Sequence, residues 1–316
     1  MNIVVTDAFT LNPGDLNWSG IKNHGSLTIF DRTTSDKLLI ERCENAEVII
    51  TNKNTFNKEI LSELPNLKLI AVAATGYNII DTKYARERGI AVCNVPDYGT
   101  DSVAQHTFAL ILEISNQVGL HNESVHNDEW INAIDWCYIK KPISELSGKT
   151  LGIIGYGKIG QKTAEIGKAF GMKIKYHNSK PIIGNENDYL PLVNLLNVSD
   201  FISLHCPAKP ESIGMVNLGF LKLMKNNAYL INTSRGQLIN ENDLAFALNE
   251  NIIAGAALDV LLTEPPAKNN PLLKAKNCII TPHNAWQAKE ARERIMLQLE
   301  KNISSFLHGN PINIVN

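Results

Sequence analysis

Short, mainly apolar runs alternate with helix-like segments through the first third of the chain. Two of the intervening segments, 35–44 and 81–88, have the apolar spacing of a helix, and Gly89 is a typical stop signal after the second. Short runs without polar alternation are typical of strands that are buried on both faces of a parallel sheet. The runs lie at 3–5, 27–30, 48–51, 69–73 and 90–93. This pattern predicts a parallel sheet with helices on both faces.

The same alternation resumes near residue 150 and predicts a second parallel sheet. Its strands are expected at 151–154, 173–176, 201–204, 229–232, 255–258 and 278–281. A helix expected at 102–115 is apolar around most of its circumference, so it should be buried between domains or between subunits. Segment 116–146 has no readable periodicity. After the second sheet, 287–306 has the pattern of a long amphipathic helix, which Gly309 and Pro311 close.

These patterns predict an α/β chain with two doubly wound parallel-sheet domains. A length of 316 residues is sufficient for two hydrophobic cores. The C-terminal helix is expected to cross back and complete the first domain, which would then consist of residues 1–99 and 287–316. The second domain would consist of residues 100–286.

Composition and charge favour neither nucleic acid nor a membrane surface as a partner. Hydrophobic residues make up 44% and charged residues 20% of the chain, which is ordinary for a soluble protein, and the net charge of −2 does not favour binding to nucleic acid or to a membrane surface. The first residues lack the basic and long apolar regions of a signal peptide. The five cysteines are scattered and fit free thiols in a reducing compartment. We therefore expect a cytoplasmic protein.

A glycine motif follows the first strand of the second sheet. The apolar run 151–154 leads directly into Gly155-x-Gly157-x-x-Gly160, and a helix that Gly171 ends comes next. The motif alone is a weak signal, but with the strand after Gly171 it completes a βαβ unit. Its glycines allow a tight turn, close approach of the backbone to a pyrophosphate, and close packing of the helix. The sequence therefore predicts a dinucleotide site in a Rossmann-type domain.

Three polar residues follow predicted strands of the same sheet. Arg235 follows the fourth strand, where ligands bind in open α/β sheets, and a guanidinium can hold the carboxylate and carbonyl oxygens of a 2-oxo acid. His283 follows the last strand, and an imidazole can deliver a proton near neutral pH. Glu264 could orient that imidazole and stabilise its protonated form. Each residue also has a structural alternative. Arg235 could form a surface ion pair, His283 could cap a helix or lie in the core, and Glu264 could be a solvated turn residue.

The other histidines do not suggest a metal site. His121 and His126 are five residues apart, which is a poor spacing for a shared helix face. His106 lies on the apolar helix and is expected to be structural. We therefore predict that no metal is bound.

Motifs along nearly the whole chain resemble those of D-isomer-specific 2-hydroxyacid dehydrogenases, in the order found in that family. They are Ala74-Thr75-Gly76-Tyr77-Asn78, the Gly155 turn, Cys206-Pro207, Asn232-Thr233-Ser234-Arg235-Gly236, Asp259-Val260, Glu264-Pro265 and Thr281-Pro282-His283. Within the family, NPGDL near the start, YGTDSVAQHTFALIL and Trp136-Cys137-Tyr138 look most like glycerate dehydrogenases, also called hydroxypyruvate reductases.

The resemblance implies a fold, a reaction and a set of site residues. It implies a flavodoxin-like substrate domain, a Rossmann domain, and hydride transfer between NAD(P)H and a small 2-oxo acid in a cleft between them. Arg235, Glu264 and His283 would be catalytic, and Thr75, Gly76, Arg235 and His283 would bind the substrate. Asp259 would accept a hydrogen bond from the nicotinamide amide. The residues assigned to the cofactor are Val103, Gly155, Gly157, Lys158, Ile159, Gly160, Asn178, Ser179, Cys206, Pro207, Thr233, Ser234, Asp259 and Ala285.

The end of the second strand of this sheet departs from the usual pattern. NAD-using members carry an acidic residue there, which accepts from the ribose 2′-hydroxyl and repels a 2′-phosphate. Here the position is Asn178, followed by Ser179 and Lys180. The sequence therefore predicts that NADP(H) is tolerated beside NAD(H), although an acidic side chain from another loop could restore a preference for NAD(H).

Two alternatives stay open at this point. One is a regulatory protein that senses a dinucleotide on the same fold, and the other is a dehydrogenase for another substrate, such as phosphoglycerate, lactate or glyoxylate. The aromatic residues between 130 and 138 are expected to influence the choice of substrate. They could do so from a partner subunit, because the apolar helix at 102–115 predicts a homodimer.

Overall fold

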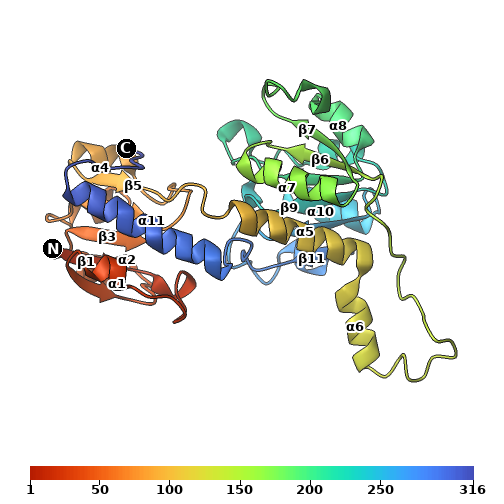
Figure 1. Ribbon diagram of the computed structural model, residues 1–316, viewed down its shortest axis with the longest axis horizontal. Coiled ribbons are helices and arrows are strands. Elements are labelled where there is room, and N and C mark those ends of the chain that lie inside the picture. The colour runs from red at the N-terminus through yellow and green to blue at the C-terminus, as the bar shows by residue number, and fades with distance from the viewer. The chain divides into compact units, whose positions relative to one another are not determined.

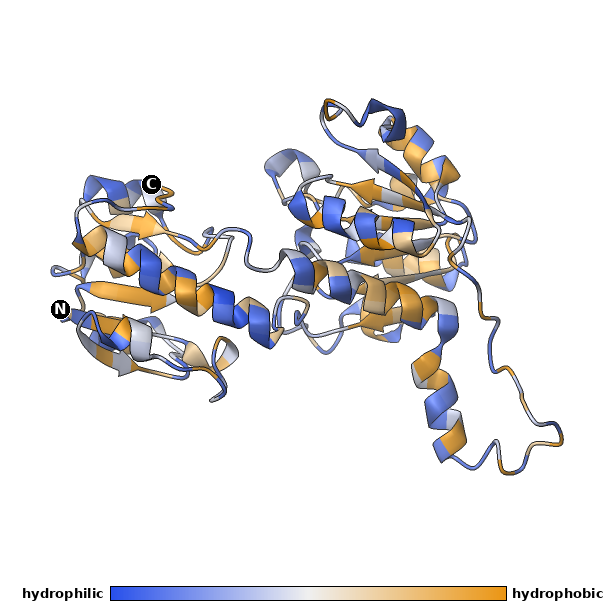
Figure 2. Cartoon of the chain, in the orientation of Figure 1, coloured by the Kyte–Doolittle hydropathy of each residue, from blue (hydrophilic) through white to orange (hydrophobic).

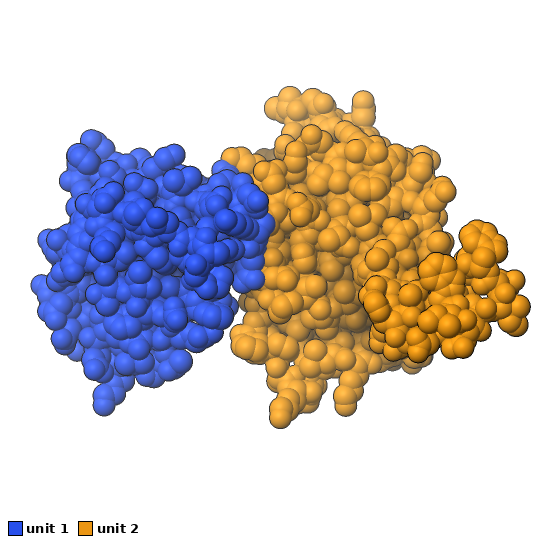
Figure 3. All heavy atoms as spheres, turned by 60° about the horizontal axis from the view of Figure 1, so that its bottom comes forward, with its two compact units in different colours: residues 1–99, 286–316 blue, residues 100–285 orange.

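The computed structural model describes all 316 residues, and the chain forms two compact units (Figure 3). Unit 1 consists of residues 1–99 and 286–316, and unit 2 of residues 100–285. The second break falls one residue before the expected boundary, so that Trp286 belongs to unit 1. There its ring packs edge-on against Tyr98, with 6.3 Å between the ring centroids.

Unit 1 is built around five parallel strands. They are β1 (Asn2–Val5), β2 (Ser26–Ile29), β3 (Val48–Thr51), β4 (Leu69–Val72) and β5 (Ala91–Cys93). They lie in the order β2-β1-β3-β4-β5, and every pairing is parallel. Figure 1 labels β1, β3 and β5 of this sheet. This is the flavodoxin-like order, in which the direction of winding reverses between β1 and β3. The α/β sheet predicted for this part of the chain is confirmed.

Helices cover both faces of the unit 1 sheet. One face packs against α2 (Asp36–Cys43), α3 (Lys58–Ser62) and α4 (Thr82–Glu87), and the other against α1 (Ser19–Lys22) and α11 (Lys289–Leu307). Successive strand residues point to opposite faces, so Ile49 joins the core under α2–α4 and Ile50 joins the core under α11. Burial of each large apolar side chain of this kind contributes about 1.5–3 kcal/mol to the free energy of unfolding.

Polar side chains define the ends of these helices. Ser35 and Asp81, which were expected to be the first helical residues, instead cap α2 and α4 by accepting from the backbone N–H of Leu38 and Tyr84. On α11, Arg292 forms a two-pronged ion pair with Asp15 at 2.6 and 2.7 Å, which ties the helix to the loop after β1. The pKa of Asp15 is lowered by this hydrogen-bonded partner.

Unit 2 contains six parallel strands. They are β6 (Thr150–Ile154), β7 (Lys173–His177), β8 (Phe201–Leu204), β9 (Tyr229–Asn232), β10 (Gly255–Leu258) and β11 (Cys278–Ile280). Their order is β11-β10-β9-β8-β6-β7, and a single parallel bridge between Tyr176 and Tyr189 extends the sheet beyond β7. The winding reverses between β6 and β8, which is where open α/β sheets bind their ligands. The predicted Rossmann-type sheet is confirmed.

The helices of unit 2 also form two layers. One face of the sheet packs against α5 (Thr100–Asn116) and α7 (Lys158–Ala169), and the other against α8 (Leu192–Val198), α9 (Leu218–Leu223) and α10 (Glu241–Asn249). The apolar helix α5 is buried as expected, but it is buried inside unit 2. Its residues Phe108, Ile111 and Ile114 share a core with Leu151 and Ile153 of β6. The apolar surface of α5 is therefore explained without a second subunit.

The segment without readable periodicity contains α6 (Val118–His126) and an irregular stretch that follows it. Gln117 has a left-handed backbone (φ 53°), which separates α6 from α5. Figure 2 shows that α6 and the chain after it extend away from the sheet of unit 2, with apolar and polar positions mixed along them. Several large apolar side chains are exposed here, including Ile131, Ile134 and Trp136.

Candidate active site

The glycine turn connects β6 to α7 at the reversal point of the sheet. Gly155 has a φ of 94°, which L-residues with a side chain rarely adopt. A Cβ atom on Gly155 would also lie only 2.5 Å from the backbone nitrogen of Cys206, so the turn packs directly on the loop after β8. Only glycine satisfies both the backbone angle and this approach.

The start of α7 has the properties of a pyrophosphate site. Gly157 is the N-cap residue, and as a glycine it offers no side-chain acceptor to the first N–H groups of the helix, which begins with Lys158, Ile159 and Gly160. A Cβ atom on Gly157 would meet no atom within 4 Å, which leaves room for a ligand against the backbone. Because the helix dipole is positive at this end, the turn fits the phosphates of a dinucleotide.

Asn178 lies beside this turn, immediately after β7. Its side-chain oxygen accepts a hydrogen bond from the backbone N–H of Tyr156 at 2.7 Å, and the N–H of Gly155 donates to the carbonyl of His177 at 3.0 Å. Ser179 follows and is exposed. Asn178 therefore contacts the glycine turn through a neutral amide, at the position where NAD-using proteins carry an acidic residue.

On the other side of the turn, His205 and Cys206 follow β8, which ends at Leu204. His205 donates its backbone N–H to the carbonyl of Ile154 at 2.8 Å, and its Nε2 lies 2.8 Å from the hydroxyl of Ser203. Burial lowers the pKa of His205 to about 4, so this imidazole is neutral near pH 7. Burial raises the pKa of the Cys206 thiol. Pro207 is exposed.

The loop that carries Arg235 is shaped by Asn232, the last residue of β9. The Asn232 side-chain oxygen accepts from both the backbone N–H and the hydroxyl of Ser234 at 3.0 Å, and its amide donates to the carbonyl of Arg235 at 2.9 Å. Asn232 is fully buried, and its hydrogen bonds hold the loop in one conformation. The guanidinium of Arg235 is exposed, and its one hydrogen bond runs to the carbonyl of Ser234 at 2.7 Å.

The loop that carries His283 is fixed by Asp259, which follows β10. One Asp259 oxygen accepts from the hydroxyl of Thr281 at 2.6 Å and the N–H of Asn284 at 3.0 Å, and the other accepts from the N–H of Ala285 at 3.0 Å. The Asp259 carbonyl also accepts from the N–H of His283 at 2.8 Å. His283 has a φ of 52°, which is uncommon outside glycine. These bonds hold the residue in that conformation.

Glu264 completes the fixation of His283. One Glu264 oxygen lies 2.5 Å from Nδ1 of His283, and the other accepts from the backbone N–H of Leu261 at 3.0 Å. Because the carboxylate faces Nδ1, the Nε2 atom of the ring is left to face a reactant. The side chains of His283 and Glu264 are 40% and 36% exposed, so a reactant can reach the pair from solvent. The predicted pairing of His283 with Glu264 is present in the structure.

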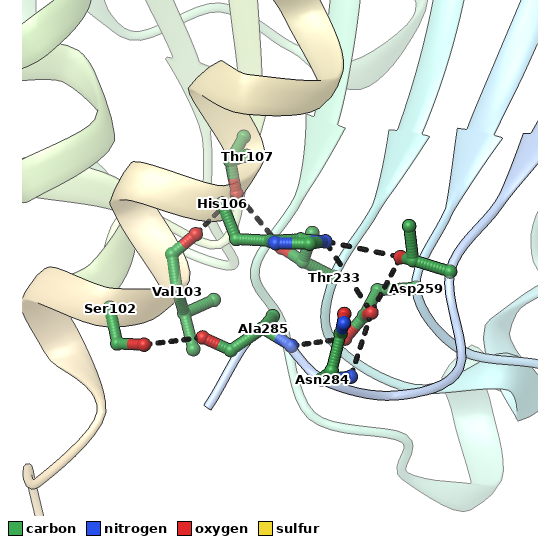
Figure 4. Close-up of polar contacts among 9 residues, drawn as sticks. Ser102, Val103, His106, Thr107, Thr233, Asp259, Asn284 and Ala285 are labelled. Carbon is green, nitrogen blue, oxygen red and sulfur yellow. Dashed lines mark hydrogen bonds and ion pairs between the residues drawn. The ribbon is translucent and has the colours of Figure 1, made fainter. Parts of the chain in front are cut away.

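Helix α5 contacts the two loops that carry Arg235 and His283 (Figure 4). The hydroxyl of Ser102 donates to the carbonyl of Ala285 at 2.6 Å. The hydroxyl of Thr107 donates to the carbonyl of Val103 at 2.8 Å, so the 3.0 Å contact with Thr233 is donated by the Thr233 hydroxyl. Val103, Thr233 and Ala285, all assigned to the cofactor by resemblance, thus lie close to one another.

Arg235, Glu264 and His283 come from the loops that follow three neighbouring strands, β9, β10 and β11. Gly236 packs so closely on the backbone of Leu261 that a Cβ atom would overlap it, which places the Arg235 loop against the Glu264 loop. The structure therefore gathers all three predicted catalytic residues at one edge of the unit 2 sheet. Their catalytic roles remain predictions.

Thr75 and Gly76 lie in unit 1, just after β4. The Thr75 hydroxyl donates to the carbonyl of Val95 at 3.0 Å, and the amide of Asn94 donates to the carbonyl of Thr75 at 2.8 Å. These two hydrogen bonds involve the hydroxyl and the carbonyl of Thr75. They do not test the predicted role of the backbone N–H groups of Thr75 and Gly76. Binding of a substrate carboxylate at this turn is a proposal that rests on resemblance.

Sequence reasoning assigned Asp259 to the nicotinamide and missed its contacts with the His283 loop. Asp259 is 1% exposed and holds four loop hydrogen bonds through its side chain and carbonyl, while its contact with a cofactor stays a prediction. Asn232, Ser102 and His106 were likewise not assigned to the site. A polar residue at the end of an apolar run was the signal in the sequence that pointed to Asn232 and Asp259. No local signal marked the helix residues.

No group of three or more His, Cys, Asp and Glu side chains is placed to hold a metal ion, and no helix has the length and apolar character needed to cross a bilayer. The remaining chemistry is that of a dinucleotide site next to an arginine and a histidine–glutamate pair. Such a combination defines a class of dinucleotide-dependent oxidoreductases in which the protein supplies substrate binding and the proton.

Comparisons with known proteins identify the family within this class. Residues 108–285 match the D-isomer specific 2-hydroxyacid dehydrogenase, NAD binding domain. The chain is 47% identical over 321 residues to a hydroxypyruvate reductase of Blautia hydrogenotrophica, covering 100% of both chains. It is 38% identical over 288 residues to a glycerate dehydrogenase of Methylorubrum extorquens, covering 90% of each. An NADPH-dependent glyoxylate/hydroxypyruvate reductase of Sinorhizobium meliloti, solved with NADP and malonate, is 26% identical with a TM-score of 0.85, covering 99% of this chain and 96% of that one.

The chain therefore belongs to the D-isomer-specific 2-hydroxyacid dehydrogenase family. It is an NAD(P)-dependent oxidoreductase, as its motifs predicted.

Proposed function

We propose that the chain interconverts hydroxypyruvate and D-glycerate. The observation that carries the chemistry is the 2.5 Å contact between His283 and Glu264 on the sheet edge that also carries Arg235. Support for the substrate comes from the hydroxypyruvate reductase and glycerate dehydrogenase named above, which align with most or all of the chain.

Each of the three side chains has a task in this proposal. Arg235 binds the carboxylate and the carbonyl oxygen of the 2-oxo acid, because a guanidinium offers paired N–H donors in one plane. His283 delivers a proton from Nε2 to the oxygen atom that was the carbonyl. Glu264 stabilises the positive charge of the imidazolium before the proton leaves. The reduced nicotinamide, when bound, supplies the hydride to the carbonyl carbon.

The first test is the loss of nicotinamide absorbance when the purified chain is mixed with hydroxypyruvate. Glyoxylate, pyruvate and phosphohydroxypyruvate serve as comparison substrates, each with NADH and with NADPH. The proposal predicts the highest kcat/KM for hydroxypyruvate. A higher value for another 2-oxo acid would replace the substrate and keep the chemistry. Cofactor binding without turnover of any of them would instead favour a regulatory protein that senses the dinucleotide.

We further propose that the chain accepts NADP(H) as well as NAD(H). The neutral side chain of Asn178 lies against the glycine turn through its bond to Tyr156, where a carboxylate would repel a 2′-phosphate. The exposed Ser179 and Lys180 follow directly and could donate to that phosphate. The S. meliloti relative described above is NADPH-dependent.

The Asn178→Asp variant tests the proposal on the cofactor. A carboxylate can still accept the Tyr156 N–H, so the turn should keep its shape while the charge changes. We expect the ratio of kcat/KM for NADH to that for NADPH to rise by roughly tenfold or more, as one like-charge contact implies. Asn227→Asp, at the opposite end of the sheet before β9, is the control for added charge. An unchanged ratio in Asn178→Asp would disprove the role of Asn178.

We propose a homodimer, but on a different surface from the one first expected. Helix α5 is covered within unit 2, whereas the chain after α6 carries Ile131, Ile134 and Trp136, whose side chains are almost fully exposed. Monomeric soluble proteins seldom leave so much apolar surface in one segment, so a second copy of this chain is the expected cover.

The dimer predicts a measured mass of two chains in size-exclusion chromatography with light scattering. Ile134→Glu should shift the protein towards one chain, because burying a carboxylate at a subunit contact is costly. Ile183→Glu replaces an equally exposed isoleucine elsewhere in unit 2 and should leave the mass unchanged. A wild-type mass of one chain would contradict the proposal.

A cytoplasmic location is also proposed. All five cysteines are free thiols, and two of them, Cys43 and Cys93, are buried in separate cores of unit 1. Unpaired cysteines are typical of reducing compartments.

A further inference from the structure

His106 is a histidine of unit 2 that the proposed chemistry does not use. It lies on α5 with 20% of its side chain exposed, and it was expected to be structural. Its Nε2 atom lies 3.1 Å from the hydroxyl oxygen of Thr281. It also lies 3.5 Å from an oxygen of Asp259, as Figure 4 shows. The first distance is a hydrogen bond and the second is a longer polar contact.

The direction of each hydrogen bond in this chain of groups can be assigned. A carboxylate only accepts hydrogen bonds, so the single hydrogen of the Thr281 hydroxyl is donated to Asp259 across 2.6 Å. The Thr281 oxygen must then accept from His106, which requires a hydrogen on Nε2 of the His106 ring. The donors run in one direction, from His106 to Thr281 to Asp259.

This chain of hydrogen bonds ends on the residue that fixes the backbone of His283. Asp259 holds the N–H groups of Asn284 and Ala285 as well as that of His283. From the same face of α5, Ser102 is four residues before His106 and holds the carbonyl of Ala285. The loop 281–285 is thus bound on one side by Asp259 and on the other by α5.

We propose that His106 is a positioning residue for the proton donor His283. By donating to Thr281, it orients the hydroxyl that binds Asp259 and so keeps the loop in the conformation that gives His283 a φ of 52°. A non-glycine residue keeps such a backbone angle only when its surroundings over-determine it. Nε2 of His283 must meet the reacting oxygen within a fraction of an ångström, so a looser loop lowers the rate of proton transfer.

The kinetic test compares two substitutions of His106. This inference rests on the proposed function, because its kinetic measurement uses reduction of hydroxypyruvate, or of whichever 2-oxo acid the wild-type chain reduces best. His106→Leu removes the donor and keeps an apolar side chain of moderate size, and we expect kcat to fall by roughly tenfold or more. His106→Gln offers an amide N–H to Thr281 and should recover most of that loss.

Other readouts separate positioning from a general structural role. The dissociation constant for NADH, measured by fluorescence, and KM for the 2-oxo acid should change by less than about threefold in both variants, because neither ligand contacts His106 in the proposal. His308→Leu, at the end of α11 in unit 1, is the control for loss of a histidine. Equal kcat values for His106→Leu and the wild type, or equal losses in the Leu and Gln variants, would overturn the proposal.

A second measurement does not depend on turnover. In ¹⁵N NMR spectra of the histidine rings, the signal that disappears in His106→Gln should show the hydrogen on Nε2. A hydrogen on Nδ1 alone would overturn the assignment of donors, even if His106→Leu failed to fold. A wild-type chain that reduces no 2-oxo acid would refute the proposed function, and the NMR result would still decide the inference on His106.

Discussion

The loops that carry Arg235 and His283 leave the same edge of one sheet, yet their side chains are held very differently. The His283 imidazole is bound by Glu264, and its backbone is bound by Asp259. The Arg235 backbone is bound by Asn232, but its exposed guanidinium donates only to the neighbouring carbonyl of Ser234. A proton donor needs its orientation and charge partner before the reactant arrives, whereas a cation that binds a carboxylate finds its partner in the substrate.

Removing the imidazole should have the largest effect. His283→Ala deletes the proposed proton donor, and we expect kcat to fall by about 10³-fold, within the range for a general acid. Binding of NADH should stay within about threefold of the wild type, because the glycine turn is untouched. Steady-state kinetics and fluorescence titration check both points. A variant that retains more than a tenth of the wild-type kcat would show that another group supplies the proton.

Arg235 should respond mainly through the substrate. Arg235→Lys keeps the charge but loses the planar pair of donors, and we expect kcat/KM to fall by about 100-fold, with a large part of the loss in KM. Since the guanidinium is exposed and has one internal bond, the melting temperature should barely change. If KM is unchanged while stability drops, Arg235 is a structural residue and the contrast between the two loops fails.

Glu264→Gln tests whether the partner of His283 acts through its charge. Glutamine can still accept a hydrogen bond from Nδ1, so the ring can keep its orientation while the negative charge is lost. We expect kcat to fall by roughly tenfold to 100-fold, which is less than for His283→Ala. Glu241→Gln, whose carboxylate binds the backbone N–H of Leu262 in the same loop, is the matched control. Equal losses in the two variants would mean that Glu264 only holds the loop.

His205 provides the smallest and most specific prediction. Unlike His283, His205 has a hydroxyl and not a carboxylate at hydrogen-bond distance, and desolvation lowers its pKa to about 4 from 6.5. Between these pH values the unfolded chain binds the extra proton, so the free energy of unfolding should fall as pH falls from about 6.5 to about 4. His205→Gln should flatten this part of the dependence, which thermal melts at several pH values can measure. An unaltered slope would rule out His205 as its source.

Several features of the fold and the family could be predicted from local sequence. The apolar runs predicted both parallel sheets because a strand buried on two faces has no polar alternation. The spacing of Gly155, Gly157 and Gly160 after such a run predicted the dinucleotide turn, because the backbone angle and close packing are local requirements. The family motifs predicted the oxidoreductase class that the comparisons confirmed.

Other features depended on which segments meet in space. The apolar helix α5 was assigned to an interface, because its pattern shows that it is buried but not what buries it. The order of β9, β10 and β11 brings Arg235, Glu264 and His283 to one edge, and nothing in their spacing specifies that order. The contacts of Asp259 and His106 join residues more than twenty positions apart.

By itself, the sequence determined the two parallel sheets, the glycine turn and the identities of the residues that can hold an anion or move a proton. Only the tertiary structure decided that Asp259 binds the His283 loop, that α5 packs inside unit 2, and that His106 reaches Thr281. The physical reason is that burial and turns are encoded by neighbours along the chain, whereas hydrogen bonds between loops depend on the order of strands and on helix packing across the whole unit.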